Sequence, residues 1–102
     1  MRGNVARDVG PVPPGEILLE DFLKPMGITQ DRLAKSIKVP ASRIHDVVRG
    51  KRPINAEMAL RLARFFGTDA RSWVNLQTHY DLECAEIKLA ARVKKEVKPH
   101  AV

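Results

Sequence analysis

The sequence has few of the features expected of a secreted, membrane-spanning or disulfide-stabilised protein. Cys84 is the only cysteine among 102 residues, so no disulfide can form within the chain, and a reducing cytoplasm is the expected compartment. No stretch approaches the roughly eighteen consecutive apolar residues of a spanning helix. Residues 1–8 also lack the apolar stretch of a secretory signal. We therefore expect a cytoplasmic protein without a membrane segment.

Metal ligands and a catalytic constellation are missing as well. The three histidines have no metal-ligand spacing among themselves or with Cys84, so neither a zinc site nor another cofactor is expected. Ser42, His45 and Asp46 are residue types found in hydrolases. Helical spacing directs them toward solvent, without a pocket or oxyanion donors. We predict that the protein is not an enzyme.

What the sequence does contain is the periodicity of helices. Hydrophobic residues make up 44% of the chain, enough for one compact core, and no useful β-type alternation occurs. A first helix is expected over 15–24, ended by Pro25 and Gly27. Further helices are expected over 29–37, capped by Thr29, and over 41–49, then from a cap at Asn55 to Gly67, then as a longer helix capped by Asp69. The sequence predicts an all-α fold of five helices.

The positive charge is concentrated in one part of the chain. The formal net charge is +6, and residues 29–52 alone contain 7 basic and 2 acidic residues, a net charge of +5. The remaining segments are close to balance, apart from a smaller excess of basic residues near the C-terminus. Such a concentration favours a surface that binds a polyanion over a generally soluble surface.

The two expected helices within this basic segment have the spacing of a helix-turn-helix unit. They are joined by the short turn 38–40. Ala34 is small and lies where the two helices must approach closely, and Val39 and Ile44 are expected to pack beneath the turn. In such a unit the second helix enters the major groove of DNA. Double-stranded DNA is therefore the predicted partner.

Residues directed away from the apolar side of the second helix are the predicted DNA contacts. Arg43 is the best candidate to recognise a base, because a guanidinium can bond both O6 and N7 of guanine. Cations at the end of this helix and in the next loop are expected to bind phosphates. The full predicted set is Gln30, Ala41, Ser42, Arg43, His45, Arg49, Lys51 and Arg52.

Several strings of residues also resemble a known family. The segments 14–18 (PGEIL) and 22–30 (FLKPMGITQ) resemble the start of HigA-type antitoxins, which belong to the lambda-repressor-like, Xre-type helix-turn-helix group. The resemblance continues through 49–54 (RGKRPI), 58–63 (MALRLA), 66–68 (FGT), 73–77 (WVNLQ) and 80–82 (YDL). It implies a lambda-repressor-like domain with a long C-terminal helix. Pro40 and Ala41 replace residues that are often polar in the family, so the operator sequence does not carry over.

The resemblance further implies two kinds of partner. One is a RelE-like, mRNA-cleaving toxin of the HigB type, which the antitoxin neutralises. The other is an operator, bound by a homodimer that represses its own operon; the operator should be an inverted repeat, because two recognition helices enter successive major grooves. The long last helix is expected to mediate dimerisation, with Trp73, Leu76, Tyr80 and Ile87 on a dimer or core face.

The sequence is predicted to divide into three segments, and two other functions are compatible with it. Residues 1–13 are expected to be an N-terminal arm, 14–82 the DNA-binding domain, and 83–102 the end of the last helix with a basic tail. A free-standing Xre-type repressor without a toxin partner is the nearest alternative. A pure interaction module, whose basic surface binds an acidic protein or a membrane surface, is the other.

Overall fold

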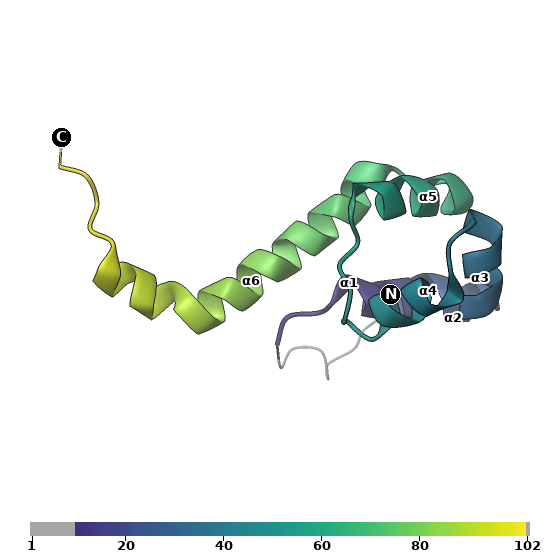
Figure 1. Cartoon of the computed structure of the whole chain (residues 1–102), viewed down its shortest axis with the longest axis horizontal. Helices are drawn as coiled ribbons and strands as arrows, with labels where there is room; N and C mark the ends of the chain where they lie inside the picture. Colours follow the sequence, from purple (N-terminus) through teal and green to yellow (C-terminus); the bar gives the residue numbers. More distant parts are fainter. Residues whose placement is uncertain (1–9, 102) are drawn as a thin grey trace.

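The structure, a computed structural model, describes residues 10–101 and consists of helices joined by loops (Figure 1). The first helical run contains α1 (Pro14–Ile17), the π-helical η2 (Leu18–Leu23) and α2 (Lys24–Met26). It is followed by α3 (Gln30–Ile37), α4 (Ala41–Val48), α5 (Ala56–Phe66) and α6 (Ala70–Glu96). The predicted all-α fold of five helices is confirmed, with the first three pieces forming one helix. Residues 1–9 of the predicted arm lie outside the described residues.

Side-chain caps that the sequence predicts are present at three helix starts. Thr29 Oγ1 accepts a hydrogen bond from the backbone N–H of Arg32 (3.1 Å) at the start of α3. Asn55 and Asp69 accept equivalent bonds, of 2.8 and 2.7 Å, at the starts of α5 and α6. The backbone bond is also the largest cause that lowers the pKa of the Asp69 carboxyl below its usual value. Short polar side chains therefore determine where these helices begin.

The first helix is longer than the predicted range 15–24: Gly27 ends it, as the sequence predicts, but Pro25 does not. The helical run passes through Pro25 and ends at Gly27, which has a left-handed φ of 66°. A proline inside an α-helix lacks a donor and clashes with the carbonyl four residues earlier. Here the Lys24 N–H bonds to the Leu19 carbonyl, five residues earlier, at the end of η2. This wider π turn changes the hydrogen-bond register immediately before the proline, which allows the helix to continue.

One apolar core connects all of the helices. Its largest fully buried side chains are Trp73, Leu18, Leu23, Leu33, Ile44, Leu62 and Val47. Trp73 Nε1 donates to Thr68 Oγ1 (2.8 Å), so the buried indole keeps a hydrogen-bond partner. The Phe22 ring lies 5.0 Å from the Trp73 ring and 4.9 Å from the Phe66 ring, measured between centroids. These aromatic contacts attach the start of α6 to α5 and to the first helix.

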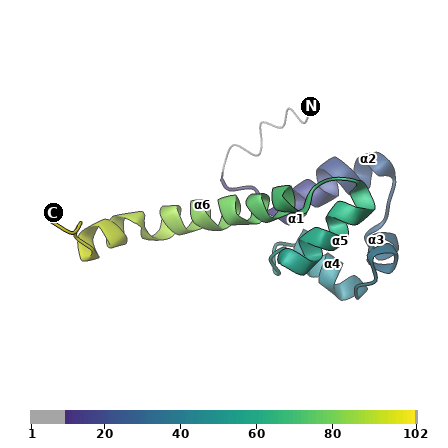
Figure 2. The ribbon, with the colours of Figure 1, turned by 90° about the horizontal axis from the view of Figure 1, so that it is seen from above.

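Helix α6 reaches beyond this core. Its 27 residues correspond to a length of about 40 Å. The first half packs on α5 and near α1, whereas the second half projects away from the other helices (Figures 1 and 2). From residue 86 to residue 101 every side chain is exposed. Among the helices within residues 10–101, none combines the length and apolar character needed to span a bilayer.

Candidate nucleic-acid interface

Helices α3 and α4 form a two-helix unit joined by the turn 38–40 (Figure 1). Ala34 on α3 and Ile44 and Val47 on α4 are buried, each no more than 2% exposed. The Val39 N–H donates to the Ala34 carbonyl (3.0 Å), and the Val39 side chain packs against the core. These contacts fix the orientation of α4 relative to α3, as the spacing of the apolar residues predicts.

The turn contains a backbone conformation that the sequence does not signal. Lys38 has a φ of 64°, in the left-handed region, where residues other than glycine and asparagine cost about 1–2 kcal/mol. Its N–H bonds to the carbonyls of Ala34 and Lys35, so it closes the C-terminal end of α3. Lysine is an unusual residue in this position, and no pattern in the sequence identifies it.

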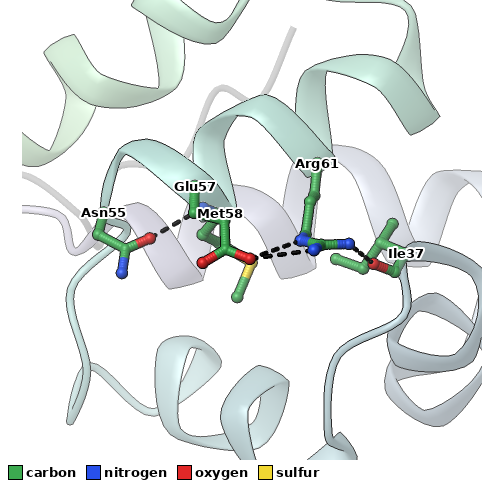
Figure 3. A network of polar contacts seen from close by, with 5 residues as sticks. All are labelled: Ile37, Asn55, Glu57, Met58 and Arg61. Carbon is green, nitrogen blue, oxygen red and sulfur yellow. Dashed lines mark hydrogen bonds and ion pairs between the residues drawn. The ribbon is translucent and has the colours of Figure 1, made fainter.

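Arg61 on α5 braces the same turn from the other side. Its Nη1 donates to the carbonyl of Ile37 (2.8 Å), and its Nε and Nη2 contact Glu57 Oε2, each at 3.0 Å (Figure 3). Ile37 is the last residue of α3, where a carbonyl has no partner within the helix and a cation is favourable. The Glu57–Arg61 spacing is visible in the sequence, but the partner carbonyl is 24 residues away, so sequence analysis missed this role.

Helix α4 places the predicted recognition residues away from the buried Ile44 and Val47. Those that are exposed or half-buried are Ala41, Ser42, Arg43, His45 and Arg49. Within residues 10–101 the Arg43 guanidinium has no hydrogen-bond or ion-pair partner, so its donors remain available. A planar guanidinium with free donors is the group that binds the edge of guanine in two places.

His45, in contrast, already has a partner. Its Nε2 lies 3.0 Å from Asp31 Oδ1, so the pair connects α4 to the first turn of α3. One hollow of about 520 Å³ is lined by His45, Gln30 and Arg49. The structure thus brings these three predicted residues together. Lys24 lines the same hollow but was not predicted, because the sequence assigns it to the end of a different helix.

Lys51 and Arg52 belong to the loop between α4 and α5. The Asp46 carbonyl accepts from the backbone N–H groups of both residues, at 2.8 and 3.2 Å, so the loop folds back on the end of α4. Both side chains are exposed. They border a second hollow, of about 260 Å³, together with residues that include Gly15 and Tyr80. The predicted DNA contacts therefore fall into a group on α3 and α4 and a group on this loop.

The four residues predicted for a dimer or core face have different surroundings. Trp73 lies in the core and is 2% exposed, whereas Ile87 lies on the projecting half of α6 and is 70% exposed. Leu76 packs against the core, and Tyr80 is half-buried. A hydrogen bond with the Cys84 side chain is the largest cause that raises the pKa of Tyr80, and burial adds to it. Of these four residues, only Ile87 is largely open to a partner.

This arrangement defines a class of protein. Two short helices meet at a turn that Arg61 also contacts, and the second helix carries Arg43, which is half-buried and has no hydrogen-bond or ion-pair partner among residues 10–101. These features make a helix-turn-helix unit, the motif that binds DNA through its second helix. A family described as helix-turn-helix matches residues 19–73, more than half of the chain.

Similarity to individual proteins shows which helix-turn-helix proteins this chain resembles. Virulence-associated protein I of Dichelobacter nodosus is 56% identical over 75 residues, which cover 74% of this chain and 69% of that protein. Antitoxin HigA-1 of Vibrio cholerae is 36% identical over 72 residues, covering 71% and 68% of the two chains. The Pseudomonas aeruginosa antitoxin HigA, solved with the higBA promoter, is 41% identical with a TM-score of 0.86, covering 89% and 99%. The chain belongs to the helix-turn-helix family that contains the HigA antitoxins.

Proposed function

We propose that this chain is a DNA-binding antitoxin that acts in the cytoplasm as a homodimer. It represses its own toxin–antitoxin operon and neutralises a RelE-like, HigB-type mRNA-cleaving toxin. The observation that carries the DNA-binding part is the half-buried Arg43 guanidinium on α4, which has no hydrogen-bond or ion-pair partner among the described residues. The similarity to an antitoxin that was solved with promoter DNA supports the same assignment. In this proposal residues 14–82 bind DNA, and the flanking segments 1–13 and 83–102 are left for other contacts.

The DNA-binding part is tested by fluorescence anisotropy with the promoter of its own operon. We expect the chain to bind an inverted repeat in that promoter at least about a thousandfold more tightly than a scrambled duplex at physiological salt. Equal affinity for the two duplexes would leave only non-specific binding of a polyanion. That result would favour the interaction module with a basic surface.

Lys51 and Arg52 are proposed to bind phosphates, because both are exposed cations on the loop that follows α4. Replacing either one by alanine should weaken binding to operator and random DNA by similar factors. The slope of log affinity against log salt concentration should become shallower by about 0.9 for each phosphate that the variant no longer binds. Salt titrations of both variants measure this slope. An unchanged slope would remove the substituted residue from the DNA interface.

The dimer is proposed to form through the projecting half of α6. Leu82, Leu89 and Val93 are 58%, 42% and 50% exposed, and spacings of seven and four residues place them on one stripe of the helix. Leu89 lies at the centre of this stripe. The acidic residues Glu83 and Glu86 come before it in the sequence, and basic residues such as Arg92, Lys94 and Lys95 come after it. An antiparallel pair of α6 helices would cover the apolar stripes and set acidic segments against basic ones.

The dimer proposal predicts that Leu89→Glu weakens self-association. A charged side chain would then face the partner at the centre of the stripe in both copies, so the dimer dissociation constant should rise at least about tenfold. Analytical ultracentrifugation measures this constant. Ile87→Glu is the matched control: it adds the same charge on an exposed apolar residue of the same helix, but lies off the stripe. A larger effect of Ile87→Glu would assign the dimer to the face predicted from the sequence.

The toxin is tested with the product of the adjacent gene. We expect that product to be a small basic protein that co-purifies with this chain, and we expect co-expression to restore growth that the product alone arrests. If the product neither binds nor arrests growth, while operator binding persists, the chain is a free-standing repressor. The support for a toxin partner is the similarity to antitoxins, including HigA-1.

A further inference from the structure

The loop that contains Lys51 and Arg52 is held at both of its ends. At the α4 end, the Asp46 carbonyl accepts from the N–H groups of these two residues. At the α5 end, the side chain of Ile54 is buried, 3% exposed, and its backbone N–H donates to Gln77 Oε1 at 2.8 Å. Residues 51–53 between these two attachments are exposed. A side chain of α6 is therefore one of the groups attached to the loop that contains the two cations.

The amide of Gln77 is itself oriented by a second bond. Its Nε2 donates to Asp81 Oδ1 at 2.9 Å, one turn further along α6. Since a carboxylate accepts only from the NH₂ end of the amide, the Oε1 end is directed to Ile54. Gln77 and Asp81 also border the hollow of about 260 Å³ that Lys51 and Arg52 border. The bond joins residues 23 positions apart, one in the loop before α5 and one on α6.

We propose that Gln77 is a positioning residue for DNA binding, which holds the Lys51–Arg52 loop where its cations meet the phosphates. The inference rests on the proposed function, because it assumes that these cations contact DNA. Without the Gln77 acceptor, the partly buried N–H of Ile54 must turn toward water to regain a hydrogen bond. That movement removes one of the two attachments at the α5 end, the other being the buried side chain of Ile54, and lets residues 51–53 move away from the position they have in this structure.

The test is Gln77→Met, which retains the length and packing of the side chain and removes the acceptor. We expect operator affinity to fall about tenfold, and the salt slope to become shallower by about 0.9 for each of the two phosphates that Lys51 and Arg52 no longer bind. Asn75→Met is the matched control, because it replaces an exposed amide on the same helix and should leave both values unchanged. Circular dichroism at the titration temperature verifies that each variant is folded.

Two further measurements separate positioning from a general loss of stability. Gln77→Met should cause no additional loss of affinity in a chain that already carries Lys51→Ala and Arg52→Ala, because the loop then has no cations to position. Amide hydrogen exchange without DNA should become faster at Ile54 and Arg52, and remain unchanged in α3. An equal loss of affinity with or without the two cations, or unchanged exchange at Ile54, would overturn the proposal.

Failure of this inference is distinguishable from failure of the proposed function. If the unmodified chain and Asn75→Met do not bind the promoter specifically, the proposed function is wrong. The exchange experiment then still determines whether Gln77 holds the loop. If both bind the promoter and Gln77→Met binds with the same affinity and salt slope, only the positioning role is wrong.

Discussion

Replacing Gly15 by alanine should destabilise the protein by about 3 kcal/mol, because α1 and α4 touch at this residue. A Cβ atom on Gly15 would lie 2.6 Å from the carbonyl carbon of Val47 and 2.8 Å from the Cα of Val48. It would lie closer still to the carbonyl oxygen of Val47. These are backbone atoms of the recognition helix, so no side chain can move aside. The two helices must separate, and chemical denaturation followed by circular dichroism measures the loss.

Gly10→Ala is the matched control for this prediction. A Cβ atom on Gly10 meets no atom within 4 Å, so stability should change by less than about 0.5 kcal/mol. Because Gly15→Ala displaces α4, operator affinity of the remaining folded protein should also fall. Equal stability of the two variants would mean that α1 does not pack on α4 in solution as it does here.

Arg43→Ala should cause the largest loss of sequence discrimination. A guanidinium that bonds guanine in two places contributes about 1–3 kcal/mol of discrimination per base pair. A dimer of the variant on an inverted repeat loses this contact twice, once in each half-site. Operator affinity should therefore fall at least about thirtyfold, and substituting the base pair that Arg43 contacts should no longer weaken binding further. Anisotropy titrations with a series of single-substituted operators identify that base pair.

Arg64→Ala is the control for the charge that Arg43→Ala removes. Arg64 is an exposed arginine on α5, outside the predicted DNA contacts, so both substitutions lower the net charge by the same amount. We expect Arg64→Ala to preserve the preference for operator over random DNA. If Arg43→Ala weakens binding to operator and random DNA equally, Arg43 binds a phosphate and the base is recognised by another residue.

Local chemistry explains which structural predictions succeeded. Thr29, Asn55 and Asp69 start their helices because a short polar side chain bonds an N–H within one turn, a contact decided entirely by neighbouring residues. Pro25 shows the limit of such rules. Its effect on the helix depends on the hydrogen-bond register of the preceding turn, and the π turn there removes the conflict that would have ended the helix.

Residues that join distant segments could not be found in this way. In the sequence Gly15 is one of several glycines and prolines near the start of the first helix, whereas in the fold it is required for the contact of α1 with the α4 backbone. Arg61 and Gln77 each bond a backbone group more than twenty residues away. Their residue types are common on exposed helix faces, so nothing local distinguishes them. Their roles depend on which helices pack together.

The periodicity of apolar residues and the caps between them specify five helices, and the charge of residues 29–52 predicts which two of them bind a polyanion. Both properties are local, since they depend on side chains within a few turns of one another. The contact of α1 with α4, the bond from α5 to the turn after α3 and the place of the Lys51–Arg52 loop join residues that are distant in the sequence. Tertiary packing decides these features, because a buried glycine contact or a long-range hydrogen bond exists only after the helices have come together.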